Sequence, residues 1–145
     1  MKLSTKGRYG VRLMLDLALN YGKGPVALKD VAKRQEISEK YLEHLITPLR
    51  KVKLIRASRG AHGGYVLVKA PGSISLQEII TAVEGPVCIV ECAKDPGICK
   101  RSQGCLSRGV WRELSDKISE TLKEITLEKI IEKNFHNGEE LCYDI

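Results

Sequence analysis

Three of the chain's five cysteines, Cys92, Cys99 and Cys105, lie in the stretch CAKDPGICKRSQGC, which contains almost no apolar residues. Thiolates bind soft metal ions and are also sites of oxidation. Zinc ligands normally come in pairs about two to four residues apart, and that pairing is absent here. Wider spacing on a loop suits an iron–sulfur cluster, whose larger body needs more chain around it. Spacing alone leaves a cluster, a zinc ion and redox-active thiols as alternatives. Three neighbouring cations would favour the thiolate form: Lys94, Lys100 and Arg101.

The remaining composition indicates where such thiols would act. The chain has no run of about 18 uncharged apolar residues, the length that a membrane-spanning helix needs. Its N-terminus is interrupted by Arg8, Arg12 and Asp16, which argues against a signal peptide. We therefore expect a cytoplasmic protein that does not enter a membrane. In that reducing compartment, clustered cysteines indicate metal ligands or redox sensors rather than a disulfide framework.

Charge is distributed unequally along the chain, whose formal net charge is +6. Residues 1–70 hold 15 Lys and Arg against 5 Asp and Glu, whereas residues 71–145 hold 9 against 13. A basic half joined to a mildly acidic half indicates a polyanion-binding domain that carries a second unit with another task. The alternative is a chance imbalance of surface charge.

The basic half is predicted to contain two short helices about a tight turn, after a first packing helix. Apolar positions at helical spacing predict the packing helix over 5–21 and a shorter helix over 28–35. After a turn of about four residues, Ser38 is a good N-cap for a further helix, because its hydroxyl can accept from the free amides of the first turn. The buried face of that helix would consist of Leu42, Leu45, Ile46 and Leu49.

The opposite face of the helix that Ser38 opens is polar and suits a recognition helix in the major groove of DNA. Pro48 lacks an amide proton and should kink or loosen the far end of this helix. Base reading is therefore expected from its first half. The polar face carries Glu39, Lys40, Glu43, His44 and Thr47.

The segments LIRASRG and YVLVK, on either side of AHGG, predict a two-stranded hairpin with a glycine-rich turn. Arg56 and Arg59 would stand at its tip or base. A narrow minor groove attracts an arginine presented in this way. Helices, turn and hairpin in this order indicate a winged helix-turn-helix that binds DNA.

The acidic half predicts a sensor loop and a long helix. Residues 75–85 form a capped amphipathic helix that packs on the basic domain, and about 15 residues of extended loop follow it. Apolar residues over 106–125 predict a helix longer than its own domain can cover, followed by one more short helix. We expect its apolar stripe to pack against a second copy, with folding back on its own domain as the alternative. A homodimer also suits a pseudo-palindromic DNA site.

The predicted fold class is thus mainly α with a small β wing: a winged helix-turn-helix domain (1–85), a cysteine-bearing sensor loop (86–105), and a dimerisation helix with its tail (106–145). Across nearly all of residues 1–132 the chain resembles the iron–sulfur cluster regulator IscR and its relatives, which include the nitric-oxide sensor NsrR and the cysteine-metabolism repressor CymR. The matching stretches are LSTKGRYGV, MLDLALN, ISEKYLEHLI, SRG, GGY, the three cysteines, CLSRGVWRELSDKI and ITLEKI.

This resemblance implies a dimeric transcription regulator whose DNA preference depends on a cluster, 2Fe-2S by analogy, held by Cys92, Cys99 and Cys105. The genes of iron–sulfur cluster assembly would be its targets. By position, Lys40, Tyr41 and Glu43 lie where the family reads the major groove. Arg59 and Gly60 lie where the wing enters the minor groove. The residues themselves add Ser38 and His44 to this predicted DNA-binding set.

One position departs from the resemblance. Relatives with a histidine ligand carry it three residues after the last cysteine, and here that residue is Arg108, which stays protonated and cannot bind iron. Cys88 or a residue of the partner's N-terminal helix is then the expected fourth ligand, ranked above a solvent molecule. His136 and Cys142 are more remote in sequence.

A rival interpretation is a CymR-like repressor that binds DNA without a metal and responds to a partner protein or to thiol oxidation. A small electron carrier is a third, poorer interpretation, because it leaves the winged helix without a task. No catalytic triad, carboxylate pair or phosphate-binding loop is recognisable. We therefore predict that the chain is not an enzyme.

Overall fold

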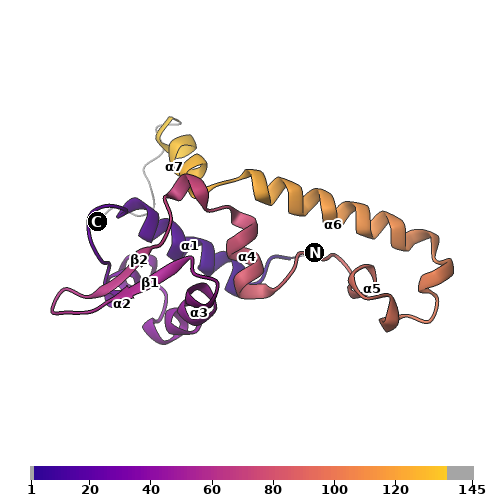
Figure 1. The fold of residues 1–145 in the computed structure, drawn as a ribbon, viewed down its shortest axis with the longest axis horizontal. Coiled ribbons are helices and arrows are strands. Elements are labelled where there is room, and N and C mark those ends of the chain that lie inside the picture. The colour runs from indigo at the N-terminus through magenta and orange to yellow at the C-terminus, as the bar shows by residue number, and fades with distance from the viewer. Residues whose placement is uncertain (1, 137–145) are drawn as a thin grey trace.

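Three helices form the N-terminal part of the core in the computed structural model, which describes residues 2–136. They are α1 (Thr5–Leu19), α2 (Leu28–Gln35) and α3 (Glu39–Lys51), as Figure 1 shows. α1 begins after Ser4, whose hydroxyl oxygen accepts from the Gly7 amide at 3.3 Å. The helices share a fully buried core that includes Leu13, Met14, Val31, Leu42, Leu45 and Leu49.

The turn between α2 and α3 follows the prediction closely. α2 ends at Glu36, which adopts a left-handed conformation with φ of 54°. Ser38 then caps α3 by accepting from the Tyr41 amide at 3.1 Å. α3 contains Pro48 and continues through it to Lys51, and the kink or loosening expected there stays a prediction. The missing amide removes one bond near the helix end, while buried Leu45 and Leu49 hold this turn on the core.

The predicted wing is present as strands β1 (Ile55–Ser58) and β2 (Gly64–Leu67), which pair antiparallel with Ser58 opposite Gly64. A bridge between Val26 and Tyr65 attaches β2 to the segment that precedes α2. Gly64 allows this close approach, since a Cβ atom there would lie 2.2 Å from the Val26 carbonyl oxygen. The fold class predicted from the sequence, mainly helical with a small β wing, is confirmed.

Two further helices close the winged domain. α4 (Leu76–Glu84) starts at a capping box in which Ser75 and Glu78 exchange hydrogen bonds, and it packs on α1. α7 (Leu127–His136) returns to the same domain, where Leu127 is fully buried and its amide donates to the Ile74 carbonyl at 3.1 Å. A short 3-10 turn, η1 (Pro71–Ser73), lies between β2 and α4.

The long helix α6 (Leu106–Glu124) extends away from the winged domain, with the cysteine segment (residues 86–105) at its far end (Figure 1). The segment is not the extended loop that we predicted: it contains α5 (Glu91–Lys94) and the 3-10 turns η2 (Pro96–Ile98) and η3 (Ser102–Gly104). Local bonds make these turns, since the Asp95 carboxylate accepts from the Gly97 amide at 2.9 Å and Ser102 donates to the Pro96 carbonyl at 2.7 Å. Among residues 2–136, no helix has the length and apolar character that crossing a membrane requires.

Candidate nucleic-acid interface and thiol site

The outward face of α3 presents the side chains that the sequence singled out. Lys40, Glu43 and His44 are exposed, and Ser38 stands exposed at the start of the helix. The Ser38 oxygen is engaged as the helix cap, so this residue first of all fixes where α3 begins. These positions form one polar surface on the first half of the helix.

Tyr41 is half-buried and differs from its neighbours on this face. Its ring packs edge-on against Tyr9 of α1, with centroids 5.7 Å apart and an interplanar angle of 85°. The Arg12 guanidinium lies 5.2 Å from the centre of the Tyr9 ring. This stack of Arg12, Tyr9 and Tyr41 holds α3 against α1, so Tyr41 contributes to the position of the helix in addition to any base contact.

The wing residues lie in the turn between β1 and β2. Arg59 and Gly60 are both exposed there. Gly60 has a φ of 122°, a conformation that side chains rarely adopt. Its carbonyl accepts from the Gly63 amide at 3.0 Å, which closes the turn. Arg56 is exposed on β1 and pairs across the hairpin with Val66, so Arg59 is the arginine closer to the tip.

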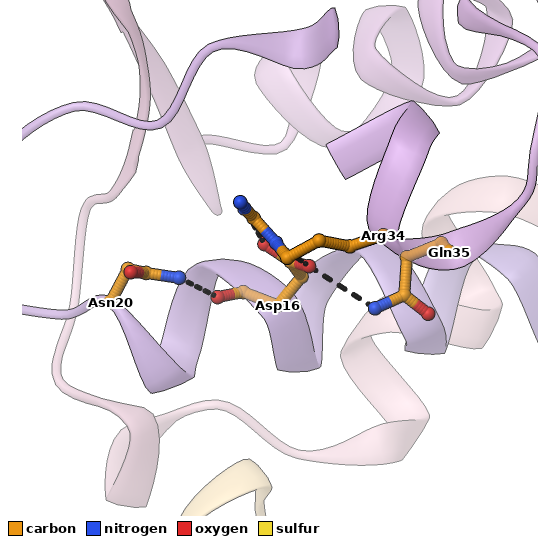
Figure 2. A network of polar contacts seen from close by, with 4 residues as sticks. All are labelled: Asp16, Asn20, Arg34 and Gln35. Carbon is orange, nitrogen blue, oxygen red and sulfur yellow. Dashed lines mark hydrogen bonds and ion pairs between the residues drawn. The ribbon is translucent and has the colours of Figure 1, made fainter. Parts of the chain in front are cut away.

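A buried polar network fixes α2 against α1, and sequence reasoning did not find it. Figure 2 shows Arg34 and Gln35 of α2 directed at the Asp16 carboxylate on α1, while Asn20 donates to the Asp16 carbonyl. Asp16 is 1% exposed. On the other side, Arg12 donates to the side chain of Gln35 at 3.1 Å and to its backbone carbonyl. Because Gln35 is the last residue of α2, the network positions the turn that leads into α3.

The pKa of Arg34 is raised by this contact. The hydrogen bond to Asp16 is the largest cause, partial burial opposes it, and the Coulombic attraction of Asp16 adds to it. The guanidinium therefore remains charged beside the buried carboxylate. One signal in the sequence could have suggested this pair. Asp16 interrupts the apolar stretch of α1, and Arg34 lies near the end of the next helix, α2.

The four cysteines of the segment occupy different local positions. Cys92 lies in α5, Cys99 follows η2 and Cys105 immediately precedes α6; the first two are half-buried and Cys105 is exposed. The Cys88 thiol donates to the Val90 carbonyl at 2.7 Å. Within the part of the chain that the structure describes, these thiols do not come together in a group that could hold a metal ion. Their chemistry, three thiols on one short segment, nevertheless fits an iron–sulfur cluster.

Arg108 connects the two ends of this segment. Its Nε donates to the Cys92 carbonyl at 2.9 Å. The Cys105 pKa is lowered, first by a hydrogen bond with Ser107, then by the Arg108 amide, and further by the Arg108 charge. His136 is exposed at the end of α7, and Cys142 lies outside the described residues. The Arg108 side chain thus joins the first turn of α6 to the backbone of α5 at Cys92.

Comparison with known proteins identifies the family. The Rrf2 family model, described as an iron-dependent transcriptional regulator, matches residues 3–133. The chain belongs to the Rrf2 family. It is 41% identical over 143 residues to the HTH-type transcriptional regulator CymR of Bacillus subtilis, covering 99% of this chain and 97% of that protein. It is 45% identical over 131 residues to the regulator IscR of Enterobacter sp., covering 90% and 80%.

A solved structure of T. potens IscR superimposes with a TM-score of 0.79 at 38% identity, covering 97% of this chain and 93% of that one. The Rrf2 chain described here is therefore a DNA-binding transcription regulator and not an enzyme, as we predicted. IscR and CymR are similar to it to nearly the same degree, so family membership alone does not choose between a cluster sensor and a CymR-like repressor.

Proposed function

We propose that this Rrf2 regulator senses iron–sulfur cluster status through Cys92, Cys99 and Cys105 and adjusts its binding to operator DNA accordingly. The observation that carries the proposal is the position of the three thiols, on a segment that joins α4 of the winged domain directly to α6. A cluster bound there would be gained when iron is available and lost when iron is scarce or oxidants are present. Cys88, four residues before Cys92, or a residue of a partner chain would complete its ligands.

The operator would be read by α3 and the wing together. Lys40 and His44 on the exposed face of α3 suit contacts in the major groove, and Arg59 at the wing tip suits the minor groove. Glu43 acts differently, because a carboxylate accepts from cytosine but repels phosphates and the acceptor edges of other bases. Its role would be discrimination between sites and not affinity.

A homodimer would place two such surfaces on one operator. One side of α6 contacts its own chain, where buried Ser115 accepts from the Ile89 amide at 3.0 Å and Gln77 donates to Ser119. Large apolar side chains of α6 remain open: Leu106, Val110, Trp111 and Leu114 are 95%, 51%, 37% and 43% exposed. A second α6 is the occupant that buries this stripe. A two-fold pair of recognition helices then matches a pseudo-palindromic site about one helical turn apart. By the resemblance to IscR, cluster-assembly genes would be controlled.

A second candidate function, a cluster-free repressor that responds to thiol oxidation, is favoured by Cys105. This thiol is exposed and its pKa is lowered, and both properties make a cysteine reactive towards oxidants. The similarity to CymR extends over 99% of this chain. Oxidation would then replace cluster loss as the signal.

Operator binding in three states separates the two functions. A duplex is first selected from a random library with the protein itself. Its Kd is then measured anaerobically for metal-free reduced protein, for protein reconstituted with ferrous iron and sulfide, and for metal-free protein treated with peroxide. The cluster function predicts about a fivefold or larger change on reconstitution. This change should be lost in Cys99→Ser and kept in Cys142→Ser. A response to peroxide alone would support the repressor instead.

A further inference from the structure

Glu84 lies where the cysteine segment meets the DNA-binding domain. It is the last residue of α4, and its Oε1 accepts from the Gly7 amide of α1 at 2.9 Å and from the Ser4 hydroxyl. A carboxylate is favourable at this point, because the free amides at the start of a helix carry partial positive charge. The side chain therefore attaches the end of α4 to the beginning of α1.

Gly7 is shaped for this contact. It is buried, and a Cβ atom at this position would lie 2.2 Å from Glu84 Oε1. Any other residue at position 7 would move the carboxylate away. The backbone of Gly7 is helical, so glycine is needed here for space and not for an unusual conformation.

The contact has a neighbour of functional interest on each side. Lys6, beside Gly7, lines the same surface hollow as Tyr41 and His44 of α3. In the other direction, only Gly85, Pro86 and Val87 separate Glu84 from Cys88. A change in the cysteine segment thus has a short covalent path to Glu84, and Glu84 has a hydrogen-bonded path to the edge of the recognition helix.

We propose that Glu84 is a positioning residue that couples the state of the cysteine segment to operator binding, by holding or releasing the start of α1 beside α3. The inference rests on the proposed function, because it assumes that the segment has two states with different effects on DNA binding. Glu84 is exposed, so water can replace its bonds when the segment pulls on the end of α4. Both states of the contact are then accessible.

Two variants break the contact from opposite sides. Glu84→Ala removes the carboxylate and with it both acceptor oxygens, whereas a glutamine would keep an oxygen that accepts from Gly7. Gly7→Ala keeps the charge and displaces the carboxylate by steric overlap. Removing a negative charge near DNA changes affinity in every state of the protein, so the informative quantity is the ratio of Kd between two states. Glu132→Ala, at an exposed position of α7, is the charge-matched control.

The test measures the Kd for the selected duplex in metal-free reduced protein and in protein reconstituted with ferrous iron and sulfide. Wild type and Glu132→Ala should show a ratio of about 5 or more, whereas both contact variants should fall below about 2. Circular dichroism and thermal unfolding establish that the variants are folded. An unchanged ratio in folded Glu84→Ala and Gly7→Ala overturns the role of Glu84 alone. A wild-type ratio of 1 instead contradicts the proposed function.

Discussion

Arg34 of α2 donates to both carboxylate oxygens of Asp16 on α1, with its Nη2 2.7 Å from Oδ1 and its Nε 3.0 Å from Oδ2. Gln35 adds a third bond to the same carboxylate at 3.1 Å. The pair is therefore more than a surface ion pair, since Asp16 is 1% exposed and Arg34 17%. It fixes the end of α2, and through the turn at Glu36 it fixes the start of the helix that we propose to read DNA.

We expect Asp16→Asn to lower the free energy of unfolding by about 3 kcal/mol, because it leaves the Arg34 charge without its buried partner. Urea unfolding followed by circular dichroism measures the loss. Asp30→Asn is the matched control on the exposed surface of α2, where the change should be below about 1 kcal/mol. A similar small effect for both variants would show that the network does not stabilise the helix pair.

Arg59→Ala should weaken binding to the selected duplex by about 1–3 kcal/mol, since it removes a cation from the exposed tip of the wing. Fluorescence anisotropy at fixed salt measures the Kd. Lys133→Ala removes the same charge from α7 and should change the Kd little. If both variants bind like wild type, the wing does not enter a groove.

The Lys69–Glu78 pair should make stability depend on pH in the acid range. Partial burial raises the Glu78 pKa, but hydrogen bonds from Lys69 and Ser75 and the Lys69 charge outweigh it, so the net pKa is lowered. The carboxylate therefore contributes stability above the ordinary carboxyl pKa, near 4.3, and this contribution is lost as the pH falls through the lower folded-state pKa.

Glu78→Gln tests this dependence, because glutamine can still complete the capping box with Ser75. Both partners are about 40% exposed, so we expect a loss of about 1 kcal/mol at pH 7. The difference from wild type should shrink when unfolding is measured below pH 4. A difference that stays constant from pH 7 to pH 3 would mean that the charge of Glu78 is not the source of the effect.

Leu114→Asp should convert the proposed dimer to a monomer. The side chain is 43% exposed in the single chain and would become buried in the apolar stripe between two copies of α6. Sedimentation equilibrium distinguishes a monomer of 16.1 kDa from a species of twice that mass. Arg112→Asp, exposed two residues before Leu114 and therefore on the far side of the helix from it, is the control. A wild-type chain that is monomeric at micromolar concentration contradicts the dimer.

Local patterns predicted the helices and the wing well. The run over 28–35 and the Ser38 cap were both found from spacing and capping preference, because these signals act within one turn of helix. α3 runs through Pro48 to Lys51, and buried Leu45 and Leu49 hold its last turns on the core. The same local logic failed between Pro96 and Gly104, where side-chain bonds to the backbone make turns without an apolar pattern.

Contacts between distant residues could not be predicted from spacing. The ion pair of Asp16 and Arg34, and the bond between Glu84 and Gly7, join residues that are brought together only by the packing of one helix on another. Residue types and spacing did select the cysteines, arginines and α3 residues of the proposed sites. How the thiols would be organised around a cluster depends on whether Cys88 or a partner-chain residue is the fourth ligand, and residue spacing does not choose between these two.

The most direct test of the account is the iron and acid-labile sulfide content of protein reconstituted anaerobically with ferrous iron and sulfide, measured together with its visible absorption. We predict a coloured wild-type protein with iron and sulfide in equal amounts. The colour should be lost in Cys92→Ala, Cys99→Ala and Cys105→Ala, and kept in Cys142→Ser. Wild-type protein that stays colourless, with no more bound iron than Cys99→Ala, would contradict the claim that this Rrf2 regulator senses a cluster.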